Sequence, residues 1–377
     1  MSQPRFLNRD FDKVKDDFIH WLNRNESRNF FMRGLAGSLQ TIIDYNISTR
    51  SIDCRTILDN LLPVLSQCDE DIYDDEGVVL AYVYIHFLER YRRTWHVLEE
   101  LVKINKLPIR SDKIEALEIG AGPASNLYAI NDFFKSLRSF SKERSYAKLT
   151  FDLPTLNAIE RSFQMNNFFH ILSEEEGREG PYGSIFHDLK GVNFKKARDL
   201  VDYQYIEKVA EEMETSEGRA EEYINRTEGG LHQAFRFNLV IFCNFLTQKQ
   251  TLEYFYPEII SAFESVRRLG LVIIMGGSDK KYSKLYSDIE NIANDRQFVR
   301  ISLPQSIPWE YSSSSAQIIK DFYSQVWDYF EEKNCVSSKH RHPDLKDVWD
   351  PAEKLRGPKH FGLRVFQKVA PSYSHAG

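Results

Sequence analysis

The residues best suited to chemistry lie around a glycine turn at positions 114–130. There an apolar segment leads into Glu118-Ile-Gly-Ala-Gly-Pro and then into a helical pattern. The apolar segment predicts a strand, and Gly120 and Gly122 allow the backbone to approach a ligand without a Cβ in the way. Pro123 suits a first helical position. The spacing therefore predicts a strand-to-helix turn that holds a ligand against backbone N–H groups.

The residues beside the glycines indicate what kind of ligand the turn holds. Dinucleotide-binding turns need a third glycine so that helix and strand pack closely, and that position is Ser125 here. Glu118, two residues before the first glycine, would also face the phosphates of a dinucleotide unfavourably. A carboxylate attracts the positive charges of a ligand that carries an ammonium group and a sulfonium. We therefore expect a cationic amino-acid moiety at this turn.

Further polar residues end the segments that we expect to be the next strands. Ala147-Lys-Leu-Thr-Phe-Asp predicts a short strand that ends in Asp152, followed by a helix from about Leu156. A strand over 183–187 ends in Asp188, and the apolar run from Phe237 ends in Asn244. Carboxylates at the carboxyl ends of parallel strands can accept hydrogen bonds from ribose hydroxyls, which is the role expected for Asp152. The alternative is that Asp152 caps the following helix.

The order of elements predicts an α/β fold with a parallel sheet and right-handed crossovers. After the strand that ends at Asn244, a helix is expected over 249–268, and a second apolar strand over 269–277. A helix to about Asn294 follows, and then strands over 298–303 and 361–369.

These segments together resemble class I S-adenosylmethionine (SAM) dependent methyltransferases. The Glu118-to-Gly122 turn is similar to their first motif, although the usual third glycine is Ala124, and residues 237–277 look like the later motifs. The resemblance implies a seven-stranded Rossmann-like methyltransferase sheet with an antiparallel last strand, SAM as cofactor, and Asp188 near the adenine amine. Asn244 either caps its strand or hydrogen-bonds the methionine moiety. With helices ahead of the turn, the chain also resembles the mitochondrial-ribosome-assembly methyltransferase-like family, without that family's cysteine cluster.

The regions around this core are expected to shape the acceptor site. Residues 1–107 have helical spacing and are expected to form an N-terminal helical region that acts as a lid or a substrate-recognition cap. Its aromatic residues from Tyr82 to Trp95 are interpreted as core, whereas three arginines, Arg90, Arg92 and Arg93, precede the ligand-binding edge. The SAM-binding core spans 108–377, with insertions at about 190–235 and 304–360. The glutamates over 208–230 predict a solvated helix face or an acidic docking surface.

The composition limits the classes of partner. With a net charge of −6 and a pI near 6.0, the chain of 377 residues is not suited to broad nucleic-acid binding. A basic cluster over 339–360 is the exception. The four cysteines are scattered, which predicts a reducing intracellular setting without a disulfide framework or structural zinc. The absence of a signal segment and of a spanning apolar run predicts a soluble, cytoplasmic protein without a membrane partner. No metal site is expected.

No residue stands out as the catalytic group. Asn244-Phe-Leu-Thr is not the signature of adenine or cytosine amino methylation, and His340, His342 and His360 are possible bases or surface histidines. The sequence favours methyl transfer to a small molecule or a protein. An RNA methyltransferase that uses the basic cluster, and a non-catalytic SAM-binding assembly factor, are the alternatives. The methyl acceptor and the oligomeric state stay open.

Overall fold

The structure is a computed structural model that covers most of the chain. It describes residues 11, 14–49, 51–66, 73, 75–109, 114–144, 153–160, 162–179, 186–188, 237–246, 249–277, 279–305, 309–351 and 361–369. The expected insertion at 190–235, with its glutamates, lies outside these residues. No helix in the described ranges is long and apolar enough to cross a membrane.

One mixed sheet forms the centre of the fold, which confirms the α/β class. Its strand order is β3-β2-β1-β4-β5-β7-β6. The strands are β1 (Glu115–Ile119), β2 (Thr155–Ile159), β3 (Phe186–Asp188), β4 (Phe237–Cys243), β5 (Val266–Gly276), β6 (Phe298–Ile301) and β7 (Gly362–Lys368). Neighbours from β3 to β5 pair in parallel, whereas β7 is antiparallel to both β5 and β6. The antiparallel last strand expected from the resemblance is therefore present.

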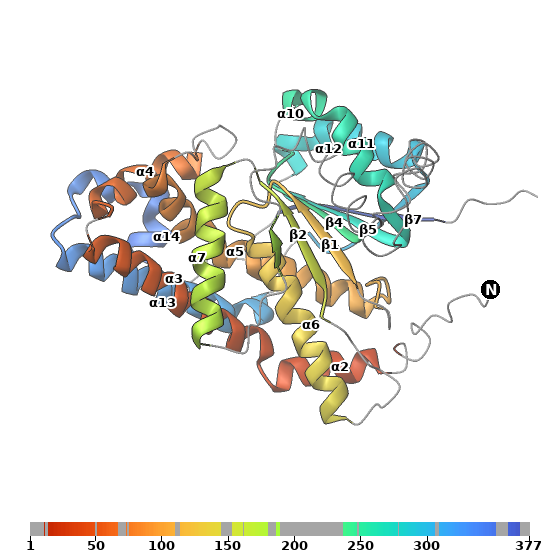
Figure 1. Ribbon diagram of the computed structural model, residues 1–377, viewed down its shortest axis with the longest axis horizontal. Coiled ribbons are helices and arrows are strands. Elements are labelled where there is room, and N and C mark those ends of the chain that lie inside the picture. The colour runs from red at the N-terminus through yellow and green to blue at the C-terminus, as the bar shows by residue number, and fades with distance from the viewer. Residues whose placement is uncertain are drawn as a thin grey trace, which may run out of the picture.

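Helices cover both faces of the sheet, as Figure 1 shows. One face packs on α10 (Lys249–Tyr254), α11 (Tyr256–Glu264) and α12 (Asp279–Asp295). The other packs on α5 (Glu76–Lys103), α6 (Ser125–Glu143) and α7 (Phe163–Glu179). The central strands are buried on both sides, since β4 has no exposed residue and β5 is buried along its last seven. Such strands read as continuous apolar runs rather than alternating ones, which is why the sequence predicts them well.

Helix α5 runs along the sheet from its carboxyl edge to its amino edge. The Oγ1 of Thr94 lies 3.9 Å from the Sδ of Met275, near the carboxyl end of β5. Just beyond the other end of α5, the Nζ of Lys106 donates to the Oε1 of Gln367, which pairs with Leu271 on the amino side of Met275 in β5. The first half of α5 therefore extends past the carboxyl edge, which is the edge where parallel α/β folds bind ligands.

A group of helices packs on this first half of α5, and we call it the helical cap (Figure 1). It consists of α3 (Ser27–Ser48), α4 (Cys54–Ser66), α13 (Trp309–Glu332), α14 (Lys346–Trp349) and the first half of α5; α2 (Lys15–Arg24) lies beside α6. The hydroxyl of Tyr84 donates to the carbonyl of Tyr323 and the hydroxyl of Tyr323 donates to that of Ile85, both at 2.7 Å. The cap thus combines the N-terminal helices with the late insertion.

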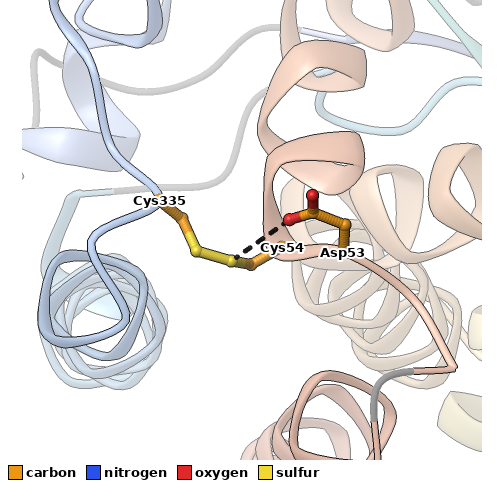
Figure 2. Close-up of side chains that lie close together, drawn as sticks. All are labelled: Asp53, Cys54 and Cys335. Atoms are coloured by element: carbon orange, nitrogen blue, oxygen red, sulfur yellow. Dashed lines mark hydrogen bonds between the residues drawn. A yellow bond between two sulfur atoms is a disulfide. The ribbon is translucent and has the colours of Figure 1, made fainter.

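The cysteine prediction is wrong in one respect. Cys54 at the start of α4 and Cys335 after α13 form a disulfide with their Cα atoms 6.0 Å apart. Figure 2 shows this bond with Asp53 beside it. The two residues are 281 positions apart, so no local spacing identifies the pair. The bond ties the two sequence-distant parts of the helical cap together.

Three predicted element boundaries are also wrong. Leu156 lies in β2, and the helix expected there begins at Phe163. The helix expected over 249–268 breaks at Phe255 into α10 and α11, with Pro257 in the first turn of α11, and β5 begins at Val266. Pro123 is not a helical residue, because α6 begins at Ser125 with Ala124 as its N-cap.

Candidate functional site

The strand order places a topological switch point between β1 and β4. The connection from β1 to β2 runs through α6 on one face, and that from β4 to β5 runs through α10 and α11 on the other. At such a point the two crossovers diverge and leave a crevice outside the carboxyl ends of the strands. The glycine turn after β1 and Asn244 after β4 both lie there, which brings these predicted site residues together.

Glu118 points from β1 toward α5 and α6 and is fully buried. Its Oε1 accepts a hydrogen bond from the side-chain amide of Asn126, whose oxygen accepts one from the hydroxyl of Thr94 at 2.6 Å. Its Oε2 accepts no hydrogen bond from any residue that the structure describes. A buried acceptor without a donor is costly, and a ligand ammonium at this place would satisfy it.

The surroundings of Glu118 favour its protonated form. Burial raises the pKa of this carboxyl group to about 8, with a smaller contribution from the Glu160 carboxylate. The Asn126 amide, the Arg90 guanidinium and the backbone N–H of Leu127 oppose this rise. Without a bound cation, removal of the carboxylate from water is the dominant cost. A positively charged ligand group beside Oε2 would lower this pKa and favour the carboxylate form of Glu118.

The glycine turn has the backbone conformation that the sequence predicts. Gly120 and Gly122 have φ values of 66° and 56°, in the left-handed region that favours glycine. A Cβ on Gly120 would lie 2.6 Å from the ring of Phe245, whereas one on Gly122 would meet only Tyr82, at 3.6 Å. Phe245, which follows β4, therefore covers Gly120. The space beside Gly122 leaves room for a ligand at the turn.

Ala124 takes the place of the third glycine and also adopts a left-handed conformation, with φ 60° and ψ 28°. An alanine in that region costs about 1 kcal/mol, which burial of its methyl group offsets to a similar extent. Ala124 thus keeps the left-handed backbone conformation of the turn, although it replaces the usual third glycine of the motif.

Glu160 is the acid at the carboxyl end of β2, and the sequence analysis missed it. Its Oε2 accepts a hydrogen bond from the backbone N–H of Gly122 at 2.7 Å, and its Oε1 accepts one from Ser162 N–H at 2.9 Å. Ile159, which precedes it, pairs with Ile119 of β1, so the carboxylate lies beside the glycine turn. Asp152, which was assigned this position, lies outside the described residues.

Arg90 and Asn244 meet across the crevice. With its amide oriented by these donors, Asn244 accepts hydrogen bonds from the Nη2 of Arg90 at 2.6 Å and from its Nε at 3.2 Å. The Arg90 guanidinium also lies 4.5 Å from the ring centroid of Tyr82. Arg90 is thus a buried cation held beside Glu118 and Gly122, and Tyr82 is a site residue as well as a core residue.

Asp188 ends β3, as predicted, two strands from β1. Only its backbone is described, so its expected role at the adenine amine stays a prediction. Of the residues that the sequence analysis overlooked, Asn126 and Thr94 are recognisable only from the packing of α5 on α6. Glu160 has a sequence signal, because it follows the alternating run Thr-Leu-Asn-Ala-Ile after Pro154.

The basic cluster at 339–360 is paired with acids where the structure describes it. Lys339 Nζ lies 2.6 Å from Asp59, and Arg341 Nη2 lies 2.6 Å from Glu331. His340 is buried, with its Nε2 2.7 Å from the same Asp59 carboxylate. These contacts join the residues to α4 and α13, and an RNA-binding role of the cluster stays a prediction. His360 and Lys359 lie outside the described residues.

Comparison with known proteins gives likeness of fold only. No family profile matches the sequence, and no curated protein matches it. Solved structures that match include an O-methyltransferase from Bacillus cereus in complex with S-adenosylhomocysteine (11% identity, 87% of this chain and 97% of that chain, TM-score 0.33). Another is the magnesium protoporphyrin IX methyltransferase of Synechocystis with bound SAM (11% identity, 62% of this chain and 90% of that chain, TM-score 0.30). A third is the precorrin-6y C5,15-methyltransferase of Geobacter metallireducens (12% identity, 72% of this chain and 88% of that chain, TM-score 0.32). At these scores the likeness supports no inference about activity, which must come from the side chains described above.

Proposed function

We propose that this protein is a SAM-dependent methyltransferase that acts on a small-molecule or protein acceptor. The observation that carries the proposal is the buried Oε2 of Glu118, which has no hydrogen-bond donor among the described residues and lies at the switch point of the sheet, where parallel α/β folds bind ligands. A cofactor with an ammonium group and a nearby sulfonium meets that need. A dinucleotide would instead bring phosphates next to a carboxyl group.

We assign one residue around the crevice to each part of SAM. Glu118 would accept hydrogen bonds from the ammonium group, and Arg90 would pair with the cofactor's carboxylate in exchange for Asn244. Glu160 would accept hydrogen bonds from the ribose hydroxyls, and Asp188 would bind the adenine amine. When bound, SAM supplies an activated methyl group that an acceptor attacks in line.

The chain's own contribution to that reaction is positioning. An in-line displacement is accelerated chiefly by holding the nucleophile near the methyl group, and it needs a general base only for a weakly acidic acceptor. Burial raises the pKa of the Cys243 thiol at the end of β4, so this thiol stays protonated and is not a nucleophile. The ring of Phe245 over Gly120 and the ring of Tyr82 near Gly122 limit water at the turn.

Calorimetric titration of S-adenosylhomocysteine into wild type and Glu160→Gln tests the proposal. The glutamine keeps an acceptor for Gly122 N–H but weakens the bonds to ribose hydroxyls, so we expect about tenfold weaker binding. Arg341→Gln, on the far side of the cap, is the control that should bind like wild type. Failure of wild type to bind, or equal binding by Glu160→Gln, would contradict the proposed site. Binding of SAM without formation of S-adenosylhomocysteine in cell extract would favour the assembly-factor alternative.

A further inference from the structure

A second arginine of α5 lies at the same edge of the sheet, one turn beyond Arg90. The guanidinium carbon of Arg93 is 5.7 Å from the ring centroid of Phe361, the residue before β7. Its electrostatic neighbours include Cys243 at the end of β4, together with Glu89 and Arg90. Arg93 therefore lies beyond the cofactor residues, between the end of β4, the start of β7 and the helical cap.

Among the described residues, the positive charge of Arg93 is not matched by a negative charge of its own. The Nε of Arg93 is buried and has no hydrogen-bond partner there. Glu89 is bonded to Arg92 at 2.9 Å, and burial lowers the pKa of Arg93 in spite of the attraction of Glu89. In the proposed complex, Arg90 is matched by the cofactor's carboxylate. Among the described residues, Arg93 is then left as a half-buried cation without a counter-ion of its own, which is a costly state for an unliganded protein.

The described neighbours of Arg93 also include aromatic residues. Phe361 is buried against it, and Tyr323 of α13 is a further electrostatic neighbour. The hydroxyl of Tyr323 is already used on the carbonyl of Ile85, so this residue offers mainly its ring. A guanidinium beside an aromatic ring suits a carboxylate on an apolar body, because its planar fork bonds both oxygens while the body packs on the ring.

We propose that Arg93 binds the carboxylate of the methyl acceptor, and that the acceptor is a small carboxylic acid with an apolar, aromatic-sized body. The inference rests on the proposed methyltransferase function and names the substrate class of that site. A polymer phosphate fits less well, because Arg93 is only partly exposed and its Nε is buried. The late insertion that carries α13 then has a role, since it forms one wall of the acceptor site.

The probe pair benzoate and benzamide tests this proposal, since the two differ only in the charged group. Binding to the full-length protein is measured by saturation-transfer NMR, with and without S-adenosylhomocysteine. We expect benzoate to bind wild type at least about tenfold more tightly than benzamide, and Arg93→Gln to lose that preference. Arg341→Gln, which removes an exposed arginine paired with Glu331, should keep it. Equal binding of the two probes to wild type, or an unchanged preference in Arg93→Gln, would overturn the proposal.

Two further measurements separate this proposal from the cofactor assignment. S-adenosylhomocysteine should bind Arg93→Gln as it binds wild type, and a parallel loss of that binding would overturn the proposal by assigning Arg93 to the cofactor. If wild type binds no S-adenosylhomocysteine, the proposed function fails. The preference for benzoate over benzamide, measured in the absence of S-adenosylhomocysteine, then still decides whether Arg93 binds a carboxylate. Arg93→Lys keeps the charge but not the fork, so it should retain part of the preference, and it covers the case in which Arg93→Gln does not fold.

Discussion

The carboxyl group of Glu118 is fully buried, and its Oε2 has no donor within the described parts of the chain. Its pKa of about 8 in the folded protein exceeds the value of about 4.5 in an unfolded chain. Between these values the folded state binds more protons, so the free energy of unfolding falls as the pH rises. We therefore expect Glu118→Gln to stabilise the ligand-free protein at pH 8 relative to pH 5, by about 3–4 kcal/mol. Urea unfolding of both proteins at the two pH values measures this difference.

The same residue should make cofactor binding depend on pH. An ammonium at Oε2 favours the carboxylate, so binding releases a proton and the affinity for S-adenosylhomocysteine should rise from pH 6 to pH 8. Glu118→Gln should bind more weakly and show a smaller rise, which calorimetry in buffers of different ionisation enthalpy detects. Parallel pH profiles for the two proteins would contradict the role of Glu118. Arg341→Gln is the control that should follow wild type.

At the residue scale, the sequence predicts the first strand's acid and glycines but not the acid of the second strand. Two alternating runs, one before Asp152 and one before Glu160, both resemble a short strand that ends in a carboxylate. The parallel register of Ile119 with Ile159 assigns β2 to the second run. Register depends on long-range pairing and turn lengths, which a local pattern does not contain.

At the scale of elements, the Cys54–Cys335 disulfide joins the start of α4 to the segment after α13 (Figure 2). Because the bond closes a loop of 281 residues, chain-entropy arguments assign it up to about 5 kcal/mol, and measured values are commonly about 2–4 kcal/mol. We expect Cys335→Ser to lower the free energy of unfolding by about 3 kcal/mol, and reductant to lower the Tm of wild type. Reductant should leave the Tm of Cys335→Ser unchanged.

The double variant Cys54→Ser/Cys335→Ser is the matched control for this prediction. If the covalent bond is the source of the stabilisation, the double variant should be about as stable as Cys335→Ser, because the second thiol contributes only its packing. Additive losses from the two substitutions would instead assign the stability to packing. The Asp59 contacts with Lys339 and His340 lie at the same junction and remain in every variant.

For the whole molecule, the sequence predicts a helical region, then a Rossmann-like core that carries a late insertion. The sequence analysis divides the helical region from the core at residue 107. In the structure, one continuous cluster of buried side chains crosses that division and joins Phe18 of α2, Trp95 of α5, Leu239 of β4 and Phe330 of α13. Helical periodicity shows that α5 has a buried face but not which partners cover it. The pairing of the N-terminal helices with the insertion arises from contacts between residues more than 200 positions apart, such as Tyr84 with Tyr323.

This shared core predicts that the cap and the sheet unfold together. The five tryptophans, at positions 21, 95, 309, 327 and 349, all lie in 1–107 or 304–360, so their fluorescence reports on the helices outside the sheet. Amide hydrogen exchange in β1, β4 and β5 reports on the sheet. We expect the same free energy of opening from both probes, and an equal increase in both when S-adenosylhomocysteine binds, because a ligand that binds only the folded state stabilises the whole cooperative unit. Loss of the fluorescence signal at lower urea than the loss of sheet protection would contradict this, and would divide the protein into a core and a cap that moves independently over the ligand-binding edge.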